Sequence, residues 1–455
     1  MEMILEFLRD VLSQPALLIG IMSCVGLIAL KRPFHKIMTG TLKPILGYLM
    51  LAAGAGVIVS NLDPLGKMIE HGFHITGVVP NNEAIVAVAQ KVLGVETMSI
   101  LVVGLLMNLL IARFTKFKYV FLTGHHSLFM ACLMSAVLGT AGLSGIELIL
   151  VGGFLMGAWS AISPAIGQSY TSKVTDGDEI ALGHFGSLGY YLSAWVAKYV
   201  GKAEESTEDI EIPEKWGFLR DSTLSTALTM IVFYLIAAIA AGSEFVATLS
   251  GSMSPYLFAV MSAMNFAVGV AIVYSGVRMI LGDLIPAFQG IATKIIPNAI
   301  PAVDCAVFFT YAPTAVVLGF ISSFIGGIIG MLILGAVGGV LIIPGLVPHF
   351  FCGATAGIYG NATGGRRGVA VGAFLNGLAI TFLPALALPV LGQLGFQNTT
   401  FGDADFAVMG LVLGNAFEWI GMAGIYGVVV IAALVLIIPN FIKTKGKVIN
   451  YVEEE

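Results

Sequence analysis

The stretch NAIPAVDCAVFF, residues 298–309, places a single carboxylate, Asp304, in the middle of an apolar run. An unpaired carboxylate in hydrocarbon costs several kcal/mol or more, so an acid at such a position needs a partner or a ligand. Its two oxygens can accept two hydroxyl hydrogen bonds at once, which suits a neutral polyhydroxylated ligand. The alternative is structural: Asp304 would cap a half-helix that begins after Pro301.

A second acid, Glu83 in PNNE (residues 80–83), takes the corresponding place in an internal repeat. The segment GVIVSNLDPLGKM starts at Gly56 and resembles GVRMILGDLIPAF, which starts at Gly276; the glycines are 220 residues apart and the acids 221. In the expected order of spans the two segments cross in opposite directions. We therefore predict the inverted repeat of a transporter, in which both Pro-x-x-acid stretches break helices at a cavity near the bilayer midplane. The alternative for Glu83 is a position nearer the outer surface.

Histidines form the second group of candidate ligand contacts. His125 and His126 in LTGHHS and His184 in ALGHFGS each follow a glycine or a Gly-His pair at the edge of an apolar segment, on the expected cytoplasmic side. A lone histidine there is usually an interfacial residue, but two Gly-His sites on one side favour a polar binding site. His349 in LVPHFF is a weak repeat match to His125, at an offset of 224 residues.

Composition decides the solvent in which these side chains lie. The 455 residues are 57% hydrophobic and only 11% charged, with a mean hydropathy of +0.94 and 56 glycines. These values predict an all-α polytopic membrane protein, because a span needs about 20 apolar residues and small residues let such helices pack closely. About eleven stretches qualify as spans: 12–30, 44–62, 97–114, 120–140, 146–168, 223–241, 255–278, 303–322, 325–347, 368–391 and 418–440.

Basic residues predict the orientation, because Lys and Arg are retained in cytoplasmic connections. KRPFHKIMTGTLK follows the first span, RFTKFK the third and KTKGK the last, whereas 141–145 and 242–254 contain no Lys or Arg. We expect an outer N-terminus, a cytoplasmic C-terminus and a multi-pass protein of the bacterial inner (plasma) membrane.

A charged interval, residues 200–222, divides the chain into two halves. It is either a solvated connection or a docking surface for a cytoplasmic partner. The segment before it, SLGYYLSAWVAKYV, predicts an amphipathic helix along the membrane surface. The expected organisation is a first repeat half (1–198), the charged loop (199–222), a second inverted half (223–442) and a cytoplasmic tail (443–455). In GGRRG, Arg366 and Arg367 would anchor the cytoplasmic side or contact phosphate.

No cofactor or metal site is expected. Cys24, Cys132, Cys305 and Cys352 are widely spaced in or beside apolar segments and read as core residues. The glycine-rich tracts lie in apolar runs, and no Walker A loop, nucleophile elbow or dinucleotide-binding fingerprint is present. The energy for transport would therefore come from an ion gradient, a substrate gradient or a separate protein; no nucleic-acid partner is expected.

Several motifs resemble those of the ascorbate-specific membrane component (IIC) of the bacterial phosphoenolpyruvate-dependent sugar phosphotransferase system, in the ascorbate/galactitol superfamily. The resemblance covers nearly the whole chain. It rests on LTGH (122–125), KVTDGDEIALGH (173–184), GKAEESTEDIEIP (201–213), GVRM (276–279), AFQGI (287–291), AVDCA (302–306), YAPTAVVLGF (311–320) and LIIPGLVPHFF (341–351).

The resemblance implies a homodimer of eleven-span protomers, each with a substrate-holding core domain and a dimer-forming V-motif built from inverted repeats with re-entrant segments. Transport would be an elevator-type movement of the core. The substrate, L-ascorbate, would pass to a cytoplasmic IIB protein that carries a phosphocysteine and is itself supplied by a IIA protein. The chain would have no phosphoryl-accepting residue, and so no catalytic residue, of its own.

The resemblance also assigns substrate contacts. These are His125, His126, Ser127, Leu128, Phe129, His184, Phe185, Asp304, Asn82 and Glu83.

The chain departs from ascorbate-specific members at some of these positions. It has Asn82-Glu83 in place of Thr-Tyr, and Phe129 and Phe185 in place of glutamines, while the two histidines and the aspartate are kept. Ascorbate is the first candidate substrate, and another sugar acid, a pentose or a polyol is the alternative. A different class of function is an ion-coupled secondary transporter in which Asp304 and Glu83 carry protons or sodium. A structural or receptor membrane protein would not need an inverted repeat.

Overall fold

The computed structural model describes residues 11, 14–74, 77–80, 82–177, 179–210, 222–392 and 399–441. The expected tail, residues 443–455, and the later part of the charged loop, residues 211–221, lie outside the described residues.

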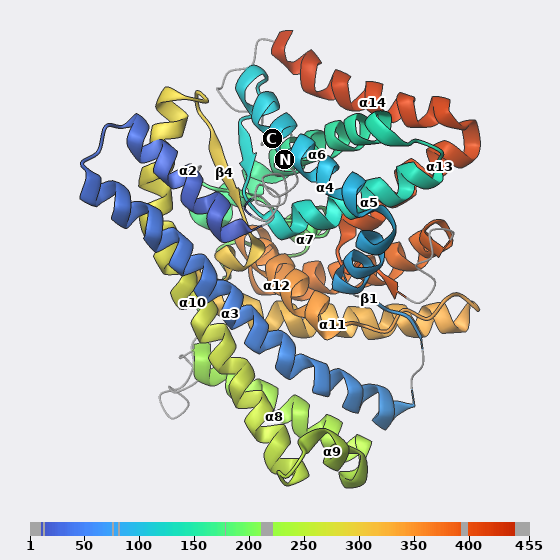
Figure 1. Ribbon diagram of the computed structural model, residues 1–455. Coiled ribbons are helices and arrows are strands. Elements are labelled where there is room, and N and C mark those ends of the chain that lie inside the picture. Colours follow the sequence, from blue (N-terminus) through green and yellow to red (C-terminus); the bar gives the residue numbers. More distant parts are fainter. Residues whose placement is uncertain are drawn as a thin grey trace.

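Helices make up most of the described chain (Figure 1). The α-helices are α2 (Pro15–Ala29), α3 (Phe34–Phe73), α4 (Asn82–Phe114), α5 (Gly124–Thr140), α6 (Gly145–Thr175), α7 (Ser187–Val200), α8 (Ser222–Ala241), α9 (Ser243–Ser250), α10 (Pro255–Lys294), α11 (Pro313–Ala336), α12 (Leu346–Gly392), α13 (Ala404–Ile420) and α14 (Met422–Ile437). The 3-10 helices are η2 (Cys305–Thr310) and η3 (Ile438–Phe441), and the strands are β1 (Val79–Pro80), β2 (Tyr119–Phe121), β3 (Ala181–Leu182), β4 (Ile300–Val303) and β5 (Thr399–Thr400).

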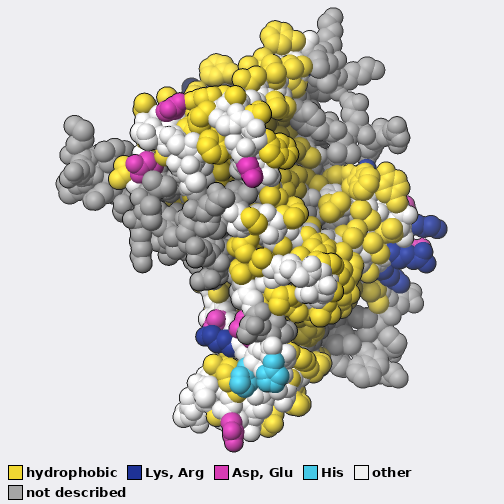
Figure 2. Space-filling view, turned by 90° about the vertical axis from the view of Figure 1, so that its right-hand side faces the viewer, with side chains coloured by type: hydrophobic (Ala, Val, Ile, Leu, Met, Phe, Trp, Pro, Cys, Tyr) yellow, Lys and Arg dark blue, Asp and Glu magenta, His cyan; other side chains and the backbone are white. Residues whose placement is uncertain are grey.

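Seven helices of the described chain are long and apolar enough to cross a bilayer, or eight if the bent pair α8 and α9 counts as one span. Figure 2 shows apolar side chains over much of one face, with charged side chains in a few groups near its margins. A surface of this kind belongs in lipid. The chain is therefore a multi-pass membrane protein; the number of eleven spans stays a prediction.

Two long helices form the arm of the molecule, which we define as α2, α3, α8, α9 and α10; the remaining helices are called the core. α3 and α10 lie side by side along the arm (Figure 1). A Cβ added at Gly54 would lie 2.7 Å from the Gly269 carbonyl oxygen, and one at Gly47 would lie 2.8 Å from that of Gly276. The two helices are thus antiparallel and packed backbone to backbone, which only glycine permits.

The structure corrects the spans expected over 303–322 and 325–347. This region instead contains η2, the single helix α11, and a connection at 337–345 before α12 begins. The connection is as apolar as a helix, so hydropathy did not reveal it. Gly338, with a φ of +71°, leaves the helical conformation after α11, and Pro344 precedes α12.

Five short strands separate the long helices at the centre of the molecule. β4 lies between β2 and β3, and all three are parallel; β1 pairs in parallel with β5, and Val78 makes an isolated parallel bridge to Ile342. Each central strand thus comes from one half of the chain and its neighbours from the other half. Both Pro-x-x-acid stretches lie at these strands, so they are breaks between helices, as the sequence predicted.

The charged loop packs against the core in its described part, residues 201–210. The backbone N–H of Arg366 donates to the Glu205 carbonyl at 2.9 Å, and the Arg366 guanidinium donates to the carbonyls of Ser206 and Asp209. These bonds form where α12 is interrupted at Gly365, whose φ is +56°. Arg366 therefore holds the loop in place, and this part of the loop is more than a solvated connection.

Candidate functional site

Three predicted site residues follow the three strands of the parallel sheet. His125 comes four residues after the end of β2, Asp304 directly after β4 and His184 two residues after β3. Because the carboxyl ends of parallel strands meet at one edge, these side chains are brought together although they are up to 179 positions apart in the sequence. The sheet is the reason that short motifs from both halves of the chain share one site.

Asp304 has both of the roles that its sequence context predicted. One oxygen, Oδ1, accepts the backbone N–H of Ala306 at 3.0 Å and caps η2. The other, Oδ2, lies 3.3 Å from His125 Nε2, and Tyr48 on α3 lies 3.2 Å from His125 Nδ1 through its hydroxyl. Asp304 is buried and the His125 side chain is 38% exposed, so this chain of polar groups leads inward from the arm.

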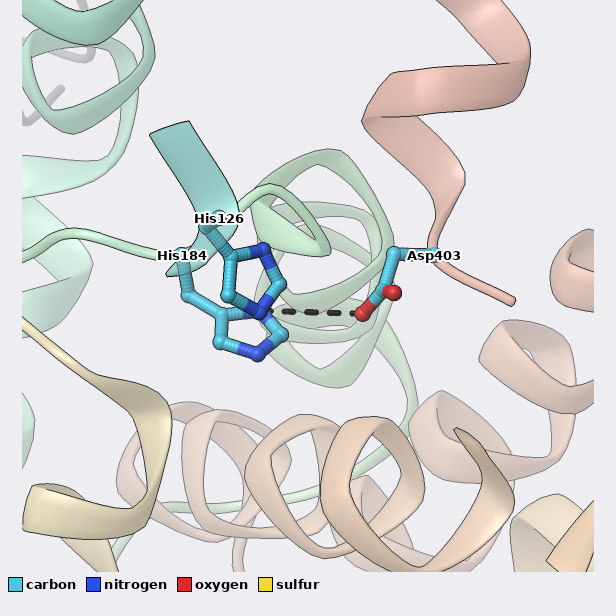
Figure 3. A group of neighbouring side chains, drawn as sticks. All are labelled: His126, His184 and Asp403. Carbon is cyan, nitrogen blue, oxygen red and sulfur yellow. Dashed lines mark ion pairs between the residues drawn. The ribbon is translucent and has the colours of Figure 1, made fainter. Parts of the chain in front are cut away.

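His184 is held from two sides. Its Nδ1 accepts the backbone N–H of Gly186 at 3.1 Å and lies 2.9 Å from the Tyr190 hydroxyl, which leaves the proton of the neutral ring on Nε2. The ring of His126 packs 3.8 Å away, centroid to centroid, and its Nδ1 accepts the N–H of Phe185 at 3.4 Å. Both rings are buried, and they lie together beside the end of β3 (Figure 3).

A second acid, Asp403, faces His184 from the end of β5. Its Oδ1 lies 3.8 Å from His184 Nδ1 (Figure 3) and accepts the Cys352 thiol at 3.0 Å. Its Oδ2 accepts the Asn82 amide at 2.6 Å, and the Asn82 carbonyl accepts the N–H of Gly402 at 2.9 Å. Asn82 therefore uses both ends of its amide to hold the loop that carries Asp403.

The other predicted contacts surround this centre. Phe185 is fully buried and stacks on Phe121 at 4.6 Å, and Phe129 lies 5.8 Å from the His125 ring. Ser127 is buried and donates to the Thr123 carbonyl within the first turn of α5, while Leu128 is half-buried in an apolar cluster. The side chain of Glu83 lies outside the described residues.

Asp405, two residues beyond Asp403, has a different environment. Its carboxylate accepts the Ser187 hydroxyl at 2.7 Å, the Leu188 N–H at 2.9 Å and the Trp159 indole N–H at 3.1 Å. It is completely buried. Asp405 therefore joins α13 to the start of α7 and keeps the His184 loop beside the Asp403 loop.

His126, His184 and Asp403 also form a possible metal-binding set. They offer three ligand atoms within 4.8 Å of one another, and His184, Asp304 and Cys305 form an overlapping set. Imidazole, carboxylate and thiolate are the ligands that Zn²⁺ uses in proteins. The sequence analysis did not expect a metal site, and the experiment on Asp403 below distinguishes this use of the cluster from sugar binding.

A small cavity lies beside Asp304, between the arm and the core. Its lining includes Ile19, Tyr48 and Ile280 from the arm, and Thr123, Asp304 and Val307 from the core. The cavity is about 10 Å³, which is room for about one water molecule. A sugar could enter only if the arm and core surfaces separated here.

The residues that the sequence analysis missed are Asp403, Cys352, Tyr48 and Tyr190. One signal was present: Gly402-Asp403 follows β5 as Gly183-His184 follows β3, at an offset of 219 residues. Extending the comparison of the two halves to this pair would have found Asp403. The tyrosines and Cys352 have no comparable local signature.

Comparisons with known proteins agree with this site. The family model described as "PTS system sugar-specific permease component" matches residues 10–405. The chain is also similar to a protein of Mycoplasma pneumoniae named "Ascorbate-specific PTS system EIIC component", with 26% identity over 474 aligned positions that cover 90% of this chain and 70% of that protein. The chain thus belongs to the family of sugar-specific permease (IIC) components of the phosphotransferase system.

Proposed function

We propose that this protein binds L-ascorbate, or a related sugar acid or polyol, and presents it to a cytoplasmic phosphocysteine IIB protein for phosphorylation. The observation that carries the proposal is the meeting of His125, His184, Asp304 and Asp403 at strand ends inside a membrane protein of this family. Buried imidazole and carboxyl groups offer several hydrogen-bond partners for sugar hydroxyls. The name of the Mycoplasma relative makes ascorbate the first substrate to test.

The two halves, 1–198 and 223–442, would be inverted repeats. α3 and α10 are each 40 residues long and start 221 positions apart, the same offset that relates Glu83 to Asp304. The exchange of strands supports the same relation, since β4 lies between strands of the first half and β1 is bridged by strands of the second. An approximate two-fold axis in the membrane plane would produce this arrangement.

Transport would follow an elevator-type movement of the core along the arm, with the arm forming the homodimer. The position of the cavity supports this division, because its lining comes from both parts. Substrate would bind from the outside, become enclosed between arm and core, and be released after phosphorylation inside. The N-terminus would be outside and the C-terminus in the cytoplasm, where the charged loop would face the IIB protein.

Phosphorylation would occur on the partner side of the site. The S–P bond of the IIB phosphocysteine would break, an O–P bond to a substrate hydroxyl would form, and the hydroxyl proton would leave to solvent or a nearby base. The present chain would supply orientation: acceptors at Asp304 and a donor at His184 Nε2 would fix which hydroxyl faces the cytoplasm.

Uptake in proteoliposomes tests the proposal. With the cognate IIA and IIB proteins and phosphoenolpyruvate inside, we expect only phosphorylated ascorbate, sugar acid or polyol to accumulate, and little uptake without IIB. Uptake of unmodified substrate by this chain alone, abolished by an uncoupler, would instead assign an ion-coupled transporter. Empty liposomes and the Asp304→Asn variant serve as controls.

A further inference from the structure

We propose that Asp403 is a specificity-determining residue, whose carboxylate favours neutral polyhydroxylated ligands over anionic ones. The inference rests on the proposed function, because it names the substrate class of the same site. Asp403 was not among the contacts that the resemblance assigned.

The side chain of Asp403 points into the site instead of capping its helix. Asp403 occupies the N-cap position of α13, where an aspartate usually accepts a backbone N–H of the first turn. It makes no such bond. Asp304, at the corresponding place before η2, does make one. The Asp403 carboxyl group therefore gives up its local partner and lies with His126 and His184 (Figure 3).

Its neighbours keep the Asp403 carboxyl group in place. Asn82 donates to one oxygen and the Cys352 thiol to the other, while His184 lies 3.8 Å from Oδ1. That last distance is too long for a hydrogen bond, and His184 Nδ1 already accepts the Gly186 N–H. Asp403 and His184 thus present two acceptor atoms toward each other, an arrangement that a hydroxyl donor would satisfy.

The site lacks a permanent positive charge. Among the described residues, no lysine or arginine forms an ion pair with Asp304, Asp403 or Asp405. Asp304 has His125 as its partner, and Asp405 has three donors of its own. Asp403 has only two neutral donors, Asn82 and Cys352, besides the neutral His184 ring.

This charge distribution separates ligand classes. A sugar or polyol hydroxyl can donate to Asp403 without bringing charge. L-Ascorbate is a monoanion at neutral pH, and its charge would meet a like charge in a buried site where screening is weak. Asp403 therefore lowers the affinity for anions more than the affinity for neutral ligands.

Calorimetric titration of the purified full-length protein tests this inference. The probes are two anions, L-ascorbate and D-gluconate, and two neutral polyols, xylitol and D-sorbitol, in a buffer with EDTA. The variants are Asp403→Asn, which keeps the shape and removes the charge, and Asp403→Ser, in case the first does not fold. Asp63→Asn is the matched control, because Asp63 is exposed on α3 and pairs only with Lys67.

We expect the wild-type protein to bind a polyol more tightly than either anion. Both Asp403 variants should raise the ratio of anion to polyol affinity by about tenfold or more, the effect of one like charge at close range. Asp63→Asn should leave the ratio unchanged.

Three results would overturn the inference. An unchanged ratio in both variants, with binding of at least one ligand class retained, would remove Asp403 from specificity and leave the proposed function standing. Failure of every probe to bind, together with no phosphorylated product in the complete transport system, would remove both. Without EDTA, stoichiometric Zn²⁺ binding that is lost in Asp403→Asn would make the cluster a metal site.

Discussion

At the scale of single residues, Asp304 shows why structural and functional roles need not exclude each other. Its two oxygens are used separately: Oδ1 caps η2, and Oδ2 faces His125. A cap fixes the carboxyl group in one orientation at the end of β4, so less conformational entropy is lost when a ligand binds. The acid in the apolar run is held in place by its own backbone.

Replacement of Asp304 by asparagine separates the two roles. Asparagine caps helices nearly as well as aspartate, so Asp304→Asn should fold normally. Loss of the charged acceptor should weaken substrate binding by about tenfold to hundredfold, the usual range for a hydrogen bond to a charged group. Calorimetric titration with the best ligand of the panel measures this loss.

The control for this substitution is Asp283→Asn, which removes an aspartate that faces Lys43 in the arm at 3.5 Å. Wild-type affinity in Asp304→Asn would mean that Asp304 is a cap alone.

At the scale of secondary-structure elements, close packing of α3 on α10 sets the shape of the arm. Gly54 and Gly269 approach each other so closely that a Cβ on either would lie less than 3 Å from the carbonyl oxygen of the other. A larger residue must move one helix away, and overpacking of this kind typically costs about 1–3 kcal/mol.

The matched pair Gly54→Leu and Gly56→Leu tests this packing. Both positions are in α3, but a Cβ at Gly56 has no atom within 4 Å. We expect Gly54→Leu to lower the thermal unfolding temperature in detergent and Gly56→Leu to leave it nearly unchanged or raise it. Equal effects would show that helix propensity, and not contact with α10, decides the result.

The charged loop supplies a second element-scale contact. Glu208 accepts the backbone N–H groups of Thr314 and Ala315 at 3.1 and 3.0 Å, at the start of α11, where no residue of the helix itself caps the end. A carboxylate is favourable at this position because the N–H groups and the helix dipole carry positive charge.

The variant Glu208→Gln should therefore destabilise the protein by about 1 kcal/mol, the usual effect of losing a charged group at a helix N-terminus. Thermal unfolding at low salt measures it, and the difference from wild type should shrink at high salt. Glu204→Gln, an exposed acid of the same loop, is the control. A similar loss in both variants would indicate a general effect of loop charge.

At the scale of the whole molecule, arm and core meet at the site. Tyr48 is the arm residue that approaches His125, and both border the polar centre of the core. One neutral hydrogen bond contributes about 1 kcal/mol, so its loss would change the population of separated arm and core about fivefold. If the core moves along the arm, this contact must break in each cycle.

Cysteine labelling measures that separation. Thr123→Cys places a thiol in the cavity wall at a buried position. Adding Tyr48→Phe should speed its reaction with a maleimide about fivefold, as the hydrogen-bond energy implies. Tyr256→Phe, an exposed tyrosine of α10, should not. An unchanged rate with Tyr48→Phe would mean that this bond does not hold the two parts together.

The sequence by itself determined the class of protein and half of the site. Apolar composition requires a membrane, and an acid or a Gly-His pair beside an apolar run marks a polar site because such groups are costly in lipid. His125, His184 and Asp304 were identified in this way. The exact helix arrangement of 303–347 was not, because apolar loop and apolar helix have the same hydropathy.

Only the tertiary structure decided which polar groups meet. Pairing of β3 with β4 and of β1 with β5 joins the two halves of the chain, and the facing strand ends bring Asp403 to His184. Asn82 proved to hold Asp403, and the Tyr48 contact depends on how arm and core pack. These contacts join residues up to 321 positions apart, and no local pattern encodes them because each depends on strand pairing and helix packing elsewhere in the fold.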